Sequence, residues 1–127
     1  VMTAALDSSV TFYAAVHPAL CDHEAYTKKR ACGWPHYFYY YGAPDAKELK
    51  VVRYYDTANF ARCLTVPGWF SWGYNDNVCP PTSMYAAYNV VTSPKELHPY
   101  LETGHYWYQE QWDEWLAWIW KQMGISK

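Results

Sequence analysis

The chain has 127 residues and a mass of 14.9 kDa, a size that suits one domain and excludes several. Hydrophobic residues make up 51% of the sequence and aromatic residues 20%, so a disordered chain is excluded and large packed aromatic surfaces are expected. The net charge is −2 and the basic residues form no patch, so we expect no nucleic-acid partner. No apolar run reaches about 18 residues, so we expect no membrane span.

The first part of the chain predicts one buried strand followed by a long excursion. Residues 2–6 are predicted to be the last turn of a helix that begins before Val1. Residues 10–16 form a continuous apolar run without alternation, which predicts a parallel strand that is covered on both faces. Residues 19–50 are rich in glycine, proline and aromatic residues, so we expect an excursion over a site, with short helices.

The second part of the chain alternates helices with strands. We predict helices over 54–64 and 81–91, and strands over 66–73 and 97–101, the second of these at a sheet edge because it contains a proline. A last helix starts near Tyr108 and ends at Gly124. Its spacing predicts one buried face, with Trp118 and Trp120 pointing away from it; the face is formed by Trp112, Trp115, Leu116, Ile119 and Met123.

This order predicts an α/β fold with parallel strands joined by right-handed crossovers. Loops after the carboxyl ends of such strands carry the chemistry, and two of them hold suitable residues. Asp76 follows the strand 66–73, and His105 follows the strand 97–101. We expect the two side chains on adjacent loops within hydrogen-bond distance, as the acid and base of a Ser-His-Asp triad in which the carboxylate fixes the imidazole tautomer.

The nucleophile of such a triad is expected in a G-x-S-x-G turn, and the sequence contains none. Ser71 is a near miss, because its first glycine lies one place too far away and it falls within a predicted strand. We therefore assign Ser71 a structural role. The missing serine is expected just before Val1.

A specific resemblance rests on four blocks of sequence: Y-Y-D-T-A-N-F-A-R (54–62), G-Y-N-D-N-V-C-P-P-T-S-M-Y-A-A-Y-N (73–89), S-P-K-E-L (93–97) and E-T-G-H (102–105). In these blocks the chain resembles the acetyl xylan esterase and cephalosporin C deacetylase family of α/β-hydrolases. The resemblance covers essentially the whole chain and is strongest from Tyr54 onward. It implies that residues 1–127 are the C-terminal portion of a single α/β-hydrolase domain whose nucleophile half lies upstream.

The resemblance assigns the catalytic acid to Asp76 and the catalytic base to His105. It implies a serine esterase that removes acetyl groups from oligo- or polysaccharides without metal or cofactor, and that forms a homo-oligomer in some members. The better-known members continue Gly-His with Glu-Gly-Gly, whereas this chain has Tyr106-Trp107-Tyr108. The excursion over 21–41 also differs from those members, so the acetylated substrate and the compartment stay open.

Two further groups of residues were weighed for binding. Trp34, Tyr37 and Trp107 could form a rim that stacks on sugar rings, or could equally pack the excursion onto the sheet. Cys21-Asp22-His23, with His17 or Cys32, fits no closed tetrahedral zinc pattern, and the four cysteines contain no C-x-x-C pair. We therefore predict no metal site and scattered buried thiols.

Two other functions stay open from the sequence. Another α/β-hydrolase, such as a prolyl-oligopeptidase-like peptidase, would place its acid and base in the same way. A non-catalytic sugar-binding module made of this portion alone would need no nucleophile. By itself the chain is predicted to be inactive as an esterase, because it lacks the serine and the oxyanion-hole donors.

Overall fold

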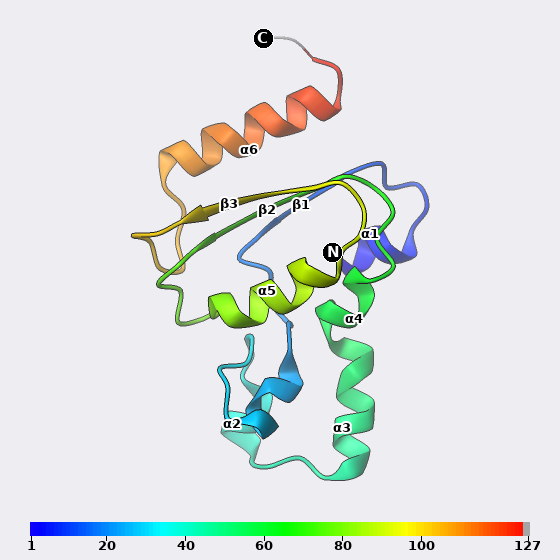
Figure 1. Cartoon of the computed structure of the whole chain (residues 1–127), viewed down its shortest axis with the longest axis vertical. Coiled ribbons are helices and arrows are strands. Elements are labelled where there is room, and N and C mark those ends of the chain that lie inside the picture. The colour runs from blue at the N-terminus through cyan, green and yellow to red at the C-terminus, as the bar shows by residue number, and fades with distance from the viewer. Residues whose placement is uncertain (126–127) are drawn as a thin grey trace.

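The computed structural model describes residues 1–125 and contains a parallel three-stranded sheet with helices on both faces (Figure 1). The strands are β1 (Tyr13–Val16), β2 (Gly68–Gly73) and β3 (Lys95–Tyr100), in the order β1-β2-β3. β2 is the central strand: its Phe70 pairs with Ala15 of β1 and with Leu97 of β3. The predicted α/β class with parallel strands is confirmed.

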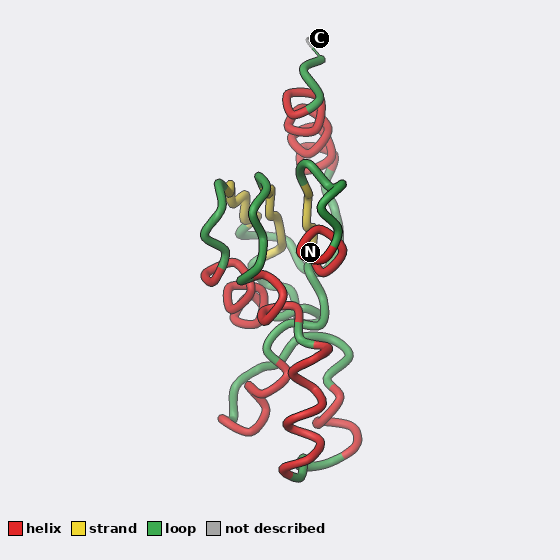
Figure 2. The backbone as a smooth tube through the Cα atoms, turned by 90° about the vertical axis from the view of Figure 1, so that its right-hand side faces the viewer, coloured by secondary structure: helices red, strands yellow, loops and turns green. Residues whose placement is uncertain are grey.

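The helices divide between the two faces of the sheet. Three of them, α1 (Met2–Leu6), α4 (Thr57–Ala61) and α5 (Pro81–Val90), lie on one face, and α6 (Gln109–Gln122) lies on the other (Figure 1). The excursion after β1 forms a separate lobe beyond the sheet (Figure 2). This lobe contains the short helices that the composition predicted, and they are η1 (His23–Lys28), α2 (Tyr37–Tyr41), α3 (Ala46–Val52) and η2 (Arg53–Tyr55).

The buried aromatic residues of β2 hold the layers together. Phe70 and Trp72 pack on the α5 side, where their rings meet Tyr88 and Tyr85 edge-on at centroid distances of 5.3 and 4.9 Å. On the α6 side, the Ser71 hydroxyl donates to the His98 backbone oxygen and accepts from the Gln111 amide. All six residues of β2 are buried, as the apolar run predicted, and Ser71 has the structural role expected of it.

Several predicted boundaries differ in the structure: β2 begins at Gly68 rather than at residue 66, and β3 runs over Lys95–Tyr100 rather than 97–101. Two further elements differ more. The first strand begins at Tyr13 rather than at residue 10, and its residues alternate between buried and half-buried because successive side chains point to opposite faces and only Tyr13 and Ala15 enter the main core. The prediction of full cover on both faces is therefore wrong. The predicted helix 54–64 divides at Asp56. The backbone of Asp56 is extended and its carboxylate accepts from the Ala58 N–H at 2.9 Å, so it caps α4 as predicted and ends η2.

The predicted buried face of α6 is correct only in part, because Trp115, Leu116 and Ile119 are half-buried. The structure buries Gln111 and Trp118, whereas Trp112 is 41% and Met123 58% exposed. Trp118 is held inward because its ring meets Phe12 edge-on and its Nε1–H donates to Glu96 at 3.0 Å. The centre of the buried face therefore lies nearer Gln111 and Trp118 than hydrophobic spacing alone predicts.

The remaining expectations concern the cysteines and the membrane. All four cysteines are free, and Cys21, Cys32 and Cys79 are buried as predicted, whereas Cys63 is exposed. Among residues 1–125, none of the helices combines the length and the apolar composition needed to cross a bilayer.

Gly73 ends β2 where the backbone of the loop after β3 comes closest. A Cβ atom at this position would collide with the backbone oxygens of Thr103 and Gly104. We expect Gly73→Ala to lower the free energy of unfolding by about 1–3 kcal/mol, because backbone atoms cannot move aside as a flexible side chain can. Urea denaturation of the chain measures this change.

Gly104→Ala is the matched control, because the nearest atoms to a Cβ there lie 3.7 and 3.9 Å away, at ordinary contact distance. Equal stability of the two variants would contradict the close approach at Gly73.

Candidate active site

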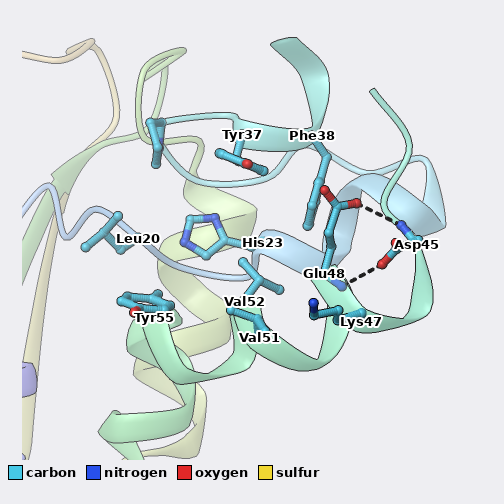
Figure 3. Close-up of a pocket in the computed structure, with 11 residues that line it drawn as sticks. Leu20, His23, Tyr37, Phe38, Asp45, Lys47, Glu48, Val51, Val52 and Tyr55 are labelled. Atoms are coloured by element: carbon cyan, nitrogen blue, oxygen red, sulfur yellow. Dashed lines mark hydrogen bonds between the residues drawn. The ribbon is translucent and has the colours of Figure 1, made fainter. Parts of the chain in front are cut away.

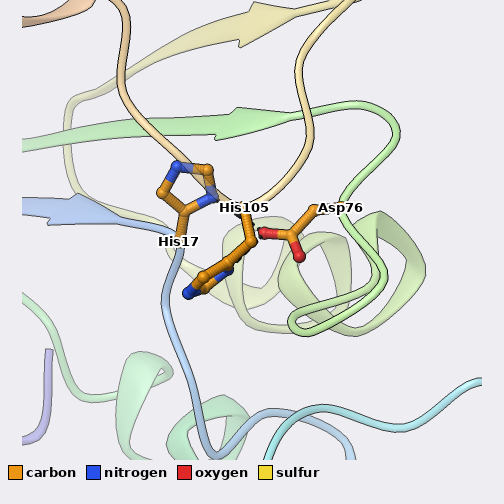
Figure 4. Close-up of side chains that lie close together, drawn as sticks. All are labelled: His17, Asp76 and His105. Atoms are coloured by element: carbon orange, nitrogen blue, oxygen red, sulfur yellow. Dashed lines mark hydrogen bonds and ion pairs between the residues drawn. The ribbon is translucent and has the colours of Figure 1, made fainter.

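Three titratable side chains from three separate loops meet at the carboxyl edge of the sheet (Figure 4). His17 directly follows β1, Asp76 lies between β2 and α5, and His105 lies between β3 and α6. Because the strands are parallel, their carboxyl ends lie at one edge, and the three loops converge there.

The Asp76 carboxylate is the centre of this group. Its Oδ2 lies 2.8 Å from Nδ1 of His17 and 2.8 Å from Nδ1 of His105. Its Oδ1 accepts the backbone N–H groups of Val78 and Cys79, each at 2.8 Å. A carboxylate offers about four acceptor positions, so all of them are filled and the group is fixed in orientation.

These contacts decide the charge of the carboxylate. Burial of the Asp76 side chain acts to raise its pKa, but the hydrogen bonds from Cys79, His105, Val78 and His17 outweigh burial and hold the pKa below its usual value. Asp76 is therefore ionised at neutral pH. Because an ionised carboxylate only accepts hydrogen bonds, both rings are assigned a proton on Nδ1.

The two imidazoles differ in their access to solvent. The His17 side chain is 6% exposed, whereas the His105 side chain is 41% exposed. With Nδ1 of His105 protonated and bound to Asp76, its Nε2 carries the free lone pair. Within residues 1–125 no hydrogen bond engages this Nε2, so it is available to accept a proton from a reacting group.

The same three side chains were tested as a metal site. One ligand atom from each lies within 4.8 Å of the others, and this is the one such group of histidine, cysteine and carboxylate side chains among the described residues. Both Nδ1 atoms are directed at Oδ2 itself, while two backbone N–H groups anchor Oδ1. A cation bound by both rings would have to occupy the position of Oδ2 of Asp76. The geometry therefore fits two N–H···O hydrogen bonds better than a bound metal ion.

The structure brings Asp76 and His105 together in the way the sequence predicted. It also adds His17, which the sequence indicated only as a possible member of a zinc pattern. The signal that could have found it is its place, because His17 directly follows a strand just as Asp76 and His105 follow theirs. The backbone of His17 has a φ of 44°, an uncommon left-handed conformation for a residue other than glycine.

The aromatic residues predicted to bind sugar do not form one group. Trp34 and Trp107 line a cavity of about 280 Å³ beside His105, together with His17, Val16, Ala19, Val78 and Cys79. Tyr37 instead lines a separate cavity of about 570 Å³ within the lobe, around the buried ring of His23 (Figure 3). Trp34 and Trp107 are therefore placed to contact a ligand at His105, and Tyr37 is not part of that cavity.

Comparison with known proteins identifies relatives of the chain. The family model described as acetyl xylan esterase (AXE1) matches residues 1–122. The chain is 46% identical over 95 residues to the acetyl esterase Axe7A of Xylanibacter ruminicola, an alignment that covers 75% of this chain and 22% of the relative. The chain thus spans under a quarter of that curated relative.

Solved structures show the same fold. The acetyl xylan esterase from Paenibacillus sp. R4 superposes with a TM-score of 0.77 at 27% identity, over 91% of this chain and 39% of that one. Acetyl xylan esterase 1 from Thermoanaerobacterium sp. JW/SL YS485 gives a TM-score of 0.78 at 24% identity, over 94% and 40% of the two chains. The sheet and its helices are thus part of an α/β-hydrolase fold, and the chain belongs to the acetyl xylan esterase family.

Proposed function

We propose that this chain supplies the acid and base of a Ser-His-Asp triad in an esterase that removes acetyl groups from carbohydrates. The observation that carries the proposal is the hydrogen bond between Oδ2 of Asp76 and Nδ1 of His105, with the other nitrogen of His105 unengaged within residues 1–125. Membership of the acetyl xylan esterase family supports the ester as substrate.

The geometry supports two proton transfers by His105. In the first half-reaction its Nε2 takes the proton of the serine hydroxyl as the serine oxygen attacks the acetyl carbonyl, and then gives that proton to the departing sugar oxygen. In the second half-reaction it takes a proton from the water that attacks the acetyl-enzyme, and then gives that proton to the serine oxygen as acetate departs. Asp76 stabilises the imidazolium that forms each time and is not itself protonated.

The serine of this scheme is proposed to come from outside residues 1–127. Ser71 cannot supply it, because its side chain is fully buried inside the sheet and its oxygen is already bonded to His98 and Gln111. Residues 1–127 contain no serine in a G-x-S-x-G turn.

The cavity beside His105 supports an acetylated sugar as the substrate. Val16, Ala19 and Val78 give it apolar walls suited to an acetyl methyl group, and the Trp34 and Trp107 rings offer faces for a sugar. We extend the proposal to acetylated oligo- or polysaccharides. Homo-oligomer formation by the intact protein stays a prediction.

The first prediction from this proposal concerns the acid and the base. In the full protein that joins residues 1–127 to a nucleophile, Asp76→Asn should lower kcat by up to ~10⁴-fold, because the amide favours the wrong imidazole tautomer. His105→Ala should lower kcat at least as much. Acetate release from acetylated xylan and hydrolysis of p-nitrophenyl acetate measure both effects.

Glu102→Gln is the matched control, an acid-to-amide change at an exposed residue three positions before His105, and it should keep near-normal turnover. If Glu102→Gln lost activity while Asp76→Asn kept normal turnover, the catalytic acid would be Glu102 and not Asp76. Cleavage of aminoacyl p-nitroanilides without acetate release would instead favour the peptidase alternative.

The second prediction concerns the isolated chain. Residues 1–127 alone should hydrolyse p-nitrophenyl acetate no faster than free imidazole does, because a general base without its nucleophile contributes little. Pre-steady-state kinetics are the direct measurement. A burst of p-nitrophenol of about one equivalent per chain would show that the chain contains its own nucleophile.

A further inference from the structure

We propose that His17 is a positioning residue of the triad, a buried imidazole that shares the Asp76 oxygen with His105 and thereby sets how strongly Asp76 holds the base. The proposal rests on the proposed esterase function. It concerns a residue that the two-member Asp76–His105 assignment does not use.

The contacts of His17 match those of His105 almost one for one. Each ring presents Nδ1 to the same oxygen of Asp76 at 2.8 Å, and the two ring centroids are 4.8 Å apart at an interplanar angle of 54°. His17 reaches this position from a left-handed backbone conformation at the end of β1. Strain of this kind persists where the surrounding structure requires it, and it clusters at functional sites.

His17 remains neutral because of where it lies. Burial lowers its pKa, and this effect outweighs the opposing attraction of the Asp76 carboxylate. The other groups that face it are His105, the backbone carbonyl of Tyr106 and the Cys79 thiol across the shared cavity, so Asp76 is the one carboxylate there among residues 1–125. A neutral ring with its proton on Nδ1 donates to Oδ2, and its buried Nε2 has no hydrogen-bond partner among the described residues.

The Nδ1–H group of His17 donates to Oδ2 and thereby weakens the hydrogen bond between Asp76 and His105. The two N–H groups draw on the same oxygen, so each bond is weaker than it would be alone. Without His17, the carboxylate would bind the protonated His105 ring more strongly. His17 therefore limits the strength of that bond, and it also prevents the carboxylate from turning.

His17→Leu and His17→Asn form a matched pair. Both side chains place an atom at the position of Nδ1, three bonds from Cα, but only the asparagine amide can donate a hydrogen bond from there. In the full protein we expect His17→Leu to lower kcat on the order of ten-fold, as loss of an orienting partner commonly does. We also expect the acid limb of the kcat/KM profile to move up by about half to one pH unit.

His17→Asn should restore both quantities to near the parent values. A merely structural His17 would reduce activity in both variants without moving the acid limb, and that result would overturn the proposal. An unchanged profile and an unchanged kcat in His17→Leu would overturn it as well.

Proton NMR of the same variants separates this proposal from the proposed function. The parent should show two far-downfield Nδ1–H signals, and His17→Leu should lose one while the His105 signal moves further downfield as its bond strengthens. His17→Asn should leave the His105 signal near its parent position. An unmoved His105 signal in His17→Leu overturns the shared-oxygen proposal, whereas a moved signal in a protein without acetyl esterase activity overturns only the proposed function.

Discussion

The candidate site depends on one buried carboxylate whose four acceptor positions are all filled. Two backbone N–H groups of the Asp76 loop fix Oδ1, and two imidazoles fix Oδ2. A buried charge without these partners would cost several kcal/mol and would become protonated instead. The hydrogen bonds keep Asp76 ionised, and an ionised, oriented Asp76 in turn fixes the tautomer and direction of His105.

The fold supplies this arrangement through its central strand. β2 is buried along its whole length, so the point at which it ends is fixed by packing on both faces of the sheet. At that point Gly73 lets the backbone of the β3–α6 loop approach directly, which brings His105 over the Asp76 loop. Parallel strands then place the end of β1, and with it His17, at the same edge.

Much of this was predictable from the sequence because apolar runs and helix caps are local signals. The three strands, the Asp56 cap and the Asp76–His105 pair follow from such signals. The face of α6 was not predictable, because the buried Gln111 and Trp118 are selected by polar partners on distant strands. His17 follows a strand, as Asp76 and His105 do, but a triad needs one histidine, so the sequence provides no reason to add a second ring to a carboxylate 59 residues away.

The central claim is that Asp76 holds both imidazoles and directs Nε2 of His105 at a serine from outside this chain. The most direct measurement is a crystal structure of the full protein with its nucleophile labelled by a phosphonate. The account predicts Nε2 of His105 within about 3.2 Å of the labelled serine Oγ, with both Nδ1 atoms still on Oδ2 of Asp76. A labelled serine remote from His105, or an Asp76 carboxylate turned away from both rings, would contradict it.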